Sequence, residues 1–115
     1  MKPLRMALAA ASLLLASSAA FAASTVTGTV TQIEGDSNGF YYVYFSATIS
    51  GQPACATNHT VYVINASTTA GAAELSVSQV AYTLQQNVTA TGLGTCGVYS
   101  AIETMAYIIT NTPPP

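Results

Sequence analysis

The sequence predicts a mainly β domain with one helix, in the order β-β-β-α-β-β, and three features favour this class. Two stretches rich in β-branched and aromatic residues flank a dense turn signal in the first half of the chain. A run of good helix formers follows a cluster of hydroxyl side chains near the middle. A third strand-like stretch precedes that run and two more follow it, so the helix is expected to interrupt a set of five strands.

The first two strands are expected to form a β-hairpin. Residues 25–34 alternate through Val26, Gly28 and Val30 and then break step before Ile33, as a β-bulge would produce. Residues 36–39 (Asp-Ser-Asn-Gly) indicate a turn, because Asp and Asn bond to nearby backbone and Gly accepts positive φ. Residues 40–49 (FYYVYFSATI) are the strongest strand candidate in the chain.

The helix is expected over residues 70–86, with N-cap hydroxyls offered by residues 67–69 (Ser-Thr-Thr). Apolar residues recur there at helical spacing and predict one modest buried stripe. The stripe consists of Ala73, Val77, Val80, Ala81 and Leu84.

The remaining strands are expected at residues 59–65, 88–93 and 103–110, with a loop at residues 94–100 between the last two. Five strands with a helix between the third and the fourth are typical of the OB-fold, a five-stranded Greek-key barrel. The sequence therefore predicts an OB-fold-like barrel. An open α+β sheet with the helix on one face is the alternative.

The N-terminus has the three parts of a secretory signal peptide. Lys2 and Arg5 form a positive n-region, residues 6–16 are apolar, and residues 20–22 (Ala-Phe-Ala) give an A-x-A cleavage site. We expect residues 1–22 to be removed, residues 23–112 to form one domain, and residues 113–115 to be a Pro-rich tail. The protein is then exported, either periplasmic or secreted, and free of the membrane. An uncleaved anchor is the alternative.

Signal cleavage would leave a chain without a basic side chain. Lys2 and Arg5 are the only Lys and Arg, whereas all four acidic residues lie beyond residue 22, so the side chains of the remaining 93 of 115 residues sum to −4 with His59 neutral. Affinity for nucleic acid depends largely on Lys and Arg neutralising phosphates. We therefore expect no nucleic-acid partner and no anionic membrane surface as a partner.

Cys55 and Cys96 are the only cysteines, and export would place them in an oxidising compartment. We expect a disulfide that closes a long loop and contributes on the order of 4 kcal/mol by the chain-entropy model. Two cysteines and a single histidine do not make a convincing zinc site, so we expect no metal and no cofactor.

A resemblance is carried by three short segments, at residues 54–56 (Ala-Cys-Ala), 69–71 (Thr-Ala-Gly) and 94–96 (Gly-Thr-Cys). In this layout the chain resembles small exported bacterial proteins and the OB-fold B subunits of subtilase-cytotoxin and pertussis-like AB5 toxins. The resemblance implies an exported glycan-binding protein that assembles as a homo-oligomer, pentameric in those toxins. No glycan-contacting residue of those toxins can be placed on this sequence position by position.

Strand residues 40–49 carry the candidate binding site. Alternation puts one set of side chains in the core and a second set outside. The core set is Tyr41, Val43, Phe45, Ala47 and Ile49, and the outer set is Phe40, Tyr42, Tyr44, Ser46 and Thr48. The aromatic stripe of Phe40, Tyr42 and Tyr44 is our candidate for ligand or partner contact, on the face that OB-folds use for ligands. Packing under the helix or the tail, or against a second copy, is the alternative.

No catalytic constellation is apparent, and we expect no catalytic residues. His59 is the only candidate for proton transfer near neutral pH, and no G-x-S-x-G or similar motif frames a serine nucleophile. Glu34 and Asp36 could act as acid and base, but a solvated hairpin loop accounts for both. Residues 36–39 resemble part of a calcium loop that lacks its bidentate Glu.

The sequence thus favours a non-enzymatic binding module that engages a glycan or a protein through the outer face of the second and third strands. The alternative is a structural or assembly subunit whose aromatic stripe is buried in a homo-oligomer interface.

Overall fold

The computed structural model describes residues 23–111 and contains five strands and one helix. The elements are β1 (Thr25–Gly35), β2 (Phe40–Phe45), β3 (Val61–Asn65), α1 (Thr69–Leu84), β4 (Asn87–Gly92) and β5 (Met105–Thr110). The mainly β class and the element order are confirmed. The signal peptide expected at residues 1–22 and the tail at 113–115 lie outside the described residues.

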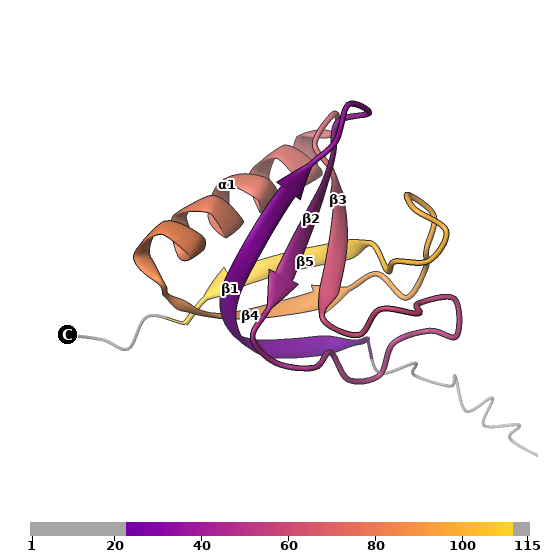
Figure 1. Ribbon diagram of the computed structural model, residues 1–115, viewed down its shortest axis with the longest axis horizontal. Coiled ribbons are helices and arrows are strands. Elements are labelled where there is room, and N and C mark those ends of the chain that lie inside the picture. Colours follow the sequence, from indigo (N-terminus) through magenta and orange to yellow (C-terminus); the bar gives the residue numbers. More distant parts are fainter. Residues whose placement is uncertain (1–22, 112–115) are drawn as a thin grey trace, which may run out of the picture.

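The strands form one antiparallel sheet in the order β3-β2-β1-β4-β5. The central strand, β1, is long and strongly bent, so that its second half pairs with β2 and its first half with β4 (Figure 1). The register between β1 and β2 shifts between Val30 and Gln32, which confirms the expected bulge. At the bend, a Cβ on Gly28 would lie 2.6 Å from Ser46 Oγ, so a larger residue there would displace the Ser46 hydroxyl.

The two edges of the sheet come together at one point only. Val63 of β3 makes a parallel bridge with Thr104, just before β5, and its N–H donates to Glu103 O at 3.0 Å. No ladder continues from this bridge, so the sheet is open along that seam and does not form a closed barrel.

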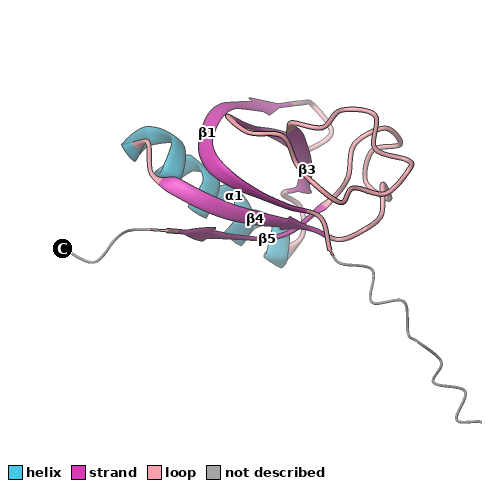
Figure 2. Ribbon diagram, turned by 90° about the horizontal axis from the view of Figure 1, so that it is seen from below, coloured by secondary structure: helices cyan, strands magenta, loops and turns pink. Residues whose placement is uncertain are grey.

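The core lies between the curved sheet and α1, which packs against β1, β3 and β5 (Figures 1 and 2). Phe45 and Tyr62 meet edge to face inside it, with ring centroids 5.8 Å apart. The buried core consists of Val26, Val30, Val43, Phe45, Ile49, Tyr62, Ile64, Ala81, Val88, Ala90, Met105 and Ile108. Tyr41 and Ala47 are partly buried against it, so every inward residue assigned to 40–49 does face the core.

The second strand is shorter than the sequence predicts, because it ends at Phe45 rather than at residue 49. The hydroxyl of Ser46 accepts the Thr29 N–H at 3.0 Å and so takes the place of a backbone acceptor. After Ser46 the chain no longer pairs with β1 as a regular strand, and it returns to β1 at Ser50, which makes an isolated bridge with Thr25.

The apolar stripe predicted for the helix is wrong in part. Ala73 is exposed, and Val80 and Leu84 are 52% and 62% exposed. The face that packs on the sheet contains instead the buried residues Gly71, Ser78 and Ala81. Small residues bring the helix close to the sheet, and a Cβ on Gly71 would overlap the carbonyl oxygen of Asn65. Thr68 is the N-cap, since its Oγ1 accepts the Gly71 N–H at 3.0 Å.

The expected disulfide is confirmed. Cys55 and Cys96 are bonded, with Cα atoms 6.2 Å apart, and they join the loop before β3 to the loop before β5. In Figures 1 and 2 both loops lie at the β3 side of the sheet. Within residues 23–111, no helix is long and apolar enough to cross a bilayer.

Candidate functional site

The pairing of β1 with β2 places tyrosines and carboxylates on one outer surface. Glu34 lies opposite Tyr42, and Gln32 lies opposite Tyr44. Directly paired residues of antiparallel strands project from the same side of the sheet. We call this surface the aromatic–acidic face, and it consists of Glu34, Asp36, Tyr42, Tyr44 and Tyr99.

Each strand tyrosine of the face is bonded to a carboxylate. The Tyr42 hydroxyl donates to Asp36 Oδ2 at 2.8 Å, and the Tyr44 hydroxyl donates to Glu34 Oε2 at 3.5 Å. Tyr99, from the loop before β5, meets the Tyr42 ring edge to face with centroids 5.7 Å apart. These contacts fix the tyrosine rings in place while leaving the tyrosines partly exposed.

The hairpin turn holds Asp36 in position. Its Oδ1 accepts the N–H groups of Asn38 at 2.8 Å and Phe40 at 3.1 Å, and Gly39 has a φ of +80°. Partial desolvation would raise the pKa of Asp36, but the hydrogen bonds from Tyr42, Phe40 and Asn38 together outweigh it and lower that pKa below its ordinary value. Asp36 is therefore ionised at neutral pH.

The tyrosine hydroxyls keep their protons for the complementary reason. Desolvation, followed by the hydrogen bond to Asp36 and its charge, raises the pKa of Tyr42 to about 12. Desolvation and Glu34 also raise the pKa of Tyr44. At neutral pH the face offers hydroxyls that donate and accept, and carboxylates that only accept.

Phe40, Tyr42 and Tyr44 all lie on the outer side of β2 and are partly buried. None of the three belongs to the core that packs with the helix. Val61 and Val63 of β3 lie opposite Tyr44 and Tyr42 on this same side, and both are 0% exposed. The exposed part of this outer surface therefore lies over β1 and β2. The part over β3 is buried, on the side of the sheet where the two disulfide-linked loops run.

The other candidate groups are not assembled into a catalytic site. His59 is exposed, and its Nδ1 lies 2.8 Å from Gln52 Oε1. Its hydrogen bond is thus to an amide and not to Asp36. Glu34 and Asp36 each bond a tyrosine rather than each other. Among residues 23–111, no group of three or more His, Cys, Asp and Glu side chains is arranged to hold a metal ion.

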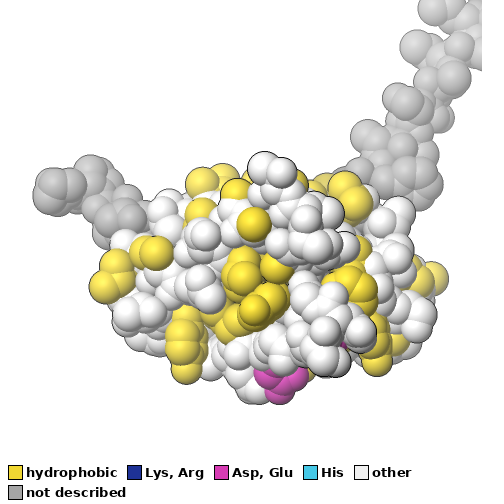
Figure 3. All heavy atoms as spheres, turned by 90° about the horizontal axis from the view of Figure 1, so that it is seen from above, with side chains coloured by type: hydrophobic (Ala, Val, Ile, Leu, Met, Phe, Trp, Pro, Cys, Tyr) yellow, Lys and Arg dark blue, Asp and Glu magenta, His cyan; other side chains and the backbone are white. Residues whose placement is uncertain are grey.

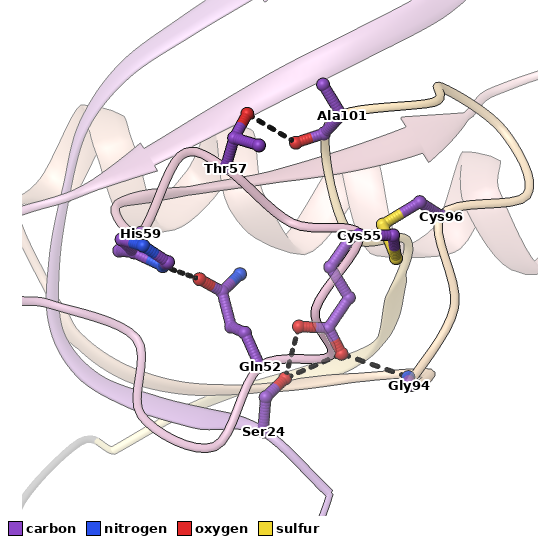
Figure 4. The surroundings of a disulfide bond; sticks show 9 residues. Ser24, Gln52, Cys55, Thr57, His59, Gly94, Cys96 and Ala101 are labelled. Carbon is purple, nitrogen blue, oxygen red and sulfur yellow. Dashed lines mark hydrogen bonds between the residues drawn. A yellow bond between two sulfur atoms is a disulfide. The ribbon is translucent and has the colours of Figure 1, made fainter.

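Sequence reasoning missed Tyr99 and a buried polar cluster around Glu103. Ser24 Oγ lies 2.7 Å from both carboxylate oxygens of Glu103 and 2.8 Å from the Tyr62 hydroxyl. The Gly94 N–H donates to Glu103 Oε2 at 2.9 Å (Figure 4). No motif or period marks the cluster, because its residues come from three separate segments that only the fold brings together.

On the surface drawn in Figure 3, hydrophobic side chains gather in groups among polar ones, acidic groups lie at one edge, and no Lys or Arg side chain is visible. No protein-family model matches the chain, and neither a curated protein nor a solved structure matches it.

Proposed function

We propose that this protein is an exported, non-enzymatic binding module that takes a glycan or a protein on its aromatic–acidic face, with an uncharged glycan as the favoured ligand. The observation that carries the proposal is the pairing of Tyr42 with Asp36 and of Tyr44 with Glu34 on a partly exposed surface.

The chemistry of these side chains suits a sugar. An aromatic ring offers an apolar face against which a sugar ring can pack, and a carboxylate accepts strong hydrogen bonds from hydroxyl groups. The face holds two carboxylates, and residues 23–111 contain no Lys or Arg. An anionic ligand such as a phosphate or a sialic acid would be repelled there, and we expect no nucleic-acid partner for the same reason.

The topology supports the binding surface through an OB-like fold. The helix lies between β3 and β4, β1 pairs with both β2 and β4, and one parallel bridge joins β3 to the start of β5. We propose that this is a partly open OB-like barrel, whose usual ligand surface includes the outer side of its second strand. This fold is also the one that the resemblance to toxin B subunits implies.

Export is supported by the disulfide, because disulfides persist mainly in oxidising compartments. The cleavage signal itself lies in residues 1–22, outside the described part of the chain. We propose a periplasmic or secreted protein that is free of the membrane once this signal is removed.

A glycan array probed with the purified mature protein tests the proposal, together with its oligomeric mass measured under native conditions. The variant Tyr42→Ser/Tyr44→Ser removes both rings, and Tyr107→Ser is the matched control, since Tyr107 is an exposed β5 tyrosine outside the face. We expect the double variant to lose glycan binding while the control keeps it.

Two results would contradict the proposal. If the wild type binds no glycan and the double variant changes only the oligomeric mass, the stripe is an assembly interface of a structural subunit. If the double variant binds as tightly as the wild type, the ligand lies elsewhere.

A further inference from the structure

Glu103 is a buried carboxylate without a cationic partner in the described structure. It is 0% exposed, and its carboxylate bonds are to the Ser24 hydroxyl and the Gly94 N–H. A Cβ on Gly92 would overlap Glu103 Oε2, so the site is also closed from β4. Buried carboxylates are normally paired with a cation, since an isolated buried charge is very costly.

The chain has few cations to offer. Lys2 and Arg5 are its only basic side chains, and both precede the expected cleavage site at residues 20–22. His59 is exposed and bonds Gln52 through its Nδ1. Cleavage after Ala22 would create one further cation, the α-ammonium group of Ala23.

Ala23 directly precedes Ser24, which is the residue that bonds the Glu103 carboxylate. One residue of backbone spans about 3.8 Å, and the Ser24 hydroxyl lies 2.7 Å from both Glu103 oxygens. Ala23 also lines a cavity of about 500 Å³ together with Ser24 and Gly94, the two residues that bond the Glu103 carboxylate, so an amine on Ala23 would have space on the side of these two partners. The same cavity is lined by Gln52, whose buried Nε2 has no hydrogen-bond partner.

We propose that Glu103 is the counter-ion of the mature N-terminus, so that signal cleavage completes the fold by supplying its missing cation. Hydrolysis of the Ala22–Ala23 peptide bond by a signal peptidase consumes one water. It leaves a carboxylate on Ala22 and an ammonium on Ala23, where the precursor has an uncharged amide. The inference rests on the export part of the proposed function and is independent of the aromatic–acidic face.

The pair has a defined pH dependence. A neighbouring carboxylate raises the pKa of an α-amine, so the stability it adds is complete below the unfolded value of about 7.7–8.0. That stability is lost as the pH rises through the higher folded value. The other titratable groups nearby are His59, which bonds Gln52 of the cavity, and Tyr62, which reaches Glu103 through Ser24. Burial, with a smaller contribution from the charge of Glu103, raises the pKa of Tyr62 to about 12, which is above this range.

The mature chain is suited to a direct test because its N-terminus would be its only primary amine. The exported protein is purified, its mass is measured to locate the N-terminus, and its rate of acetylation by acetic anhydride is followed from pH 6 to 10. We expect the pH dependence of the rate to give an amine pKa at least one unit above the ordinary value. Because only the unprotonated amine reacts, acetylation at pH 7.5 should then be about tenfold slower than for an ordinary α-amine. Acetylated protein, prepared in urea and refolded, should melt about 4–8 °C lower.

Glu103→Gln is the key variant and Glu74→Gln is its control, since Glu74 is a carboxylate of α1 that lies outside both the cavity and the aromatic–acidic face. In Glu103→Gln the amine should react at the ordinary rate, and acetylation should leave the melting temperature unchanged, whereas in Glu74→Gln the amine should react, and acetylation should lower the melting temperature, as in the wild type. If Glu103→Gln does not fold, the pH dependence of acetylation in the wild type tests the inference by itself. An ordinary amine pKa, a melting temperature insensitive to acetylation, or an N-terminus other than Ala23 would each overturn the inference. Glycan binding is measured separately and can survive any of these results.

Discussion

Two tyrosine–carboxylate clusters occupy contrasting places in this molecule. On the outer side of the hairpin, Tyr42 bonds Asp36 directly, and both remain partly open to solvent. In the interior, Tyr62 reaches Glu103 through the Ser24 hydroxyl, and all three residues are 0% exposed. The same pair of chemical groups can therefore present a binding surface in one place and hold together distant segments in another.

The difference lies in what covers each cluster. The buried cluster joins the start of β1, the middle of β3 and the segment before β5, so its hydrogen bonds have no competition from water. The exposed cluster sits beside a turn and is covered only at one edge by Tyr99. Loss of a buried group should therefore cost stability, and loss of an exposed one should cost binding.

Breaking the disulfide should have the largest effect. Cys55→Ser/Cys96→Ser frees both the loop that carries Tyr99 and the segment that carries Glu103. The 41-residue separation corresponds to a loss of about 4 kcal/mol in the free energy of unfolding. Urea denaturation of the variant and of the reduced wild type should give equal losses. Two free thiols titrated in the denatured, exported wild type would contradict the bond itself.

A methyl group introduced beside the buried cluster should have the next largest effect. Gly92→Ala would place its Cβ against Glu103 and Ser24, so we expect a loss of about 1–3 kcal/mol from overpacking. Gly97→Ala is the matched control, because no atom lies within 4 Å of the added Cβ there. Thermal melting of the two variants measures the difference, and equal melting temperatures would show that the Glu103 cluster is loosely packed.

A third carboxylate, Glu74 of α1, extends the comparison to intermediate burial. Desolvation raises its pKa to about 7. The raised value means that its contribution to stability is complete below the unfolded value near 4.5 and declines as the pH rises through 7. Since Glu74 is partly exposed, the expected loss is on the order of 1 kcal/mol. Glu74→Gln should remove that part of the decline between pH 5 and 8, and an unchanged pH profile of melting would contradict the burial effect.

The sequence predicted what depends on local pattern. Turn residues and alternation along the strands predicted the hairpin, the bulge and the two faces of β2, and capping chemistry predicted the N-cap hydroxyl. The number of cysteines and the expected oxidising compartment predicted the disulfide. The misses involve contacts between distant segments. The helix buries Ser78 and exposes Leu84 because the fit of helix to sheet decides which face packs. The sequence shows Glu103 only as one of four acidic residues, since nothing near it in the sequence indicates that Ser24 will reach it.

The most direct test of the central claim follows the tyrosine ring signals by NMR while the best glycan from the array is added. We expect the signals of Tyr42, Tyr44 and Tyr99 to shift together. Those of the buried Tyr62 and of Tyr107, on the outside of β5, should stay in place. In the double variant Tyr42→Ser/Tyr44→Ser, the glycan should no longer shift the Tyr99 signal. This variant should lose less than about 1 kcal/mol in the free energy of unfolding, whereas Phe45→Ala in the core should lose about 3–5 kcal/mol. A shift confined to Tyr107, or unfolding of the double variant, would contradict the assignment of the aromatic–acidic face.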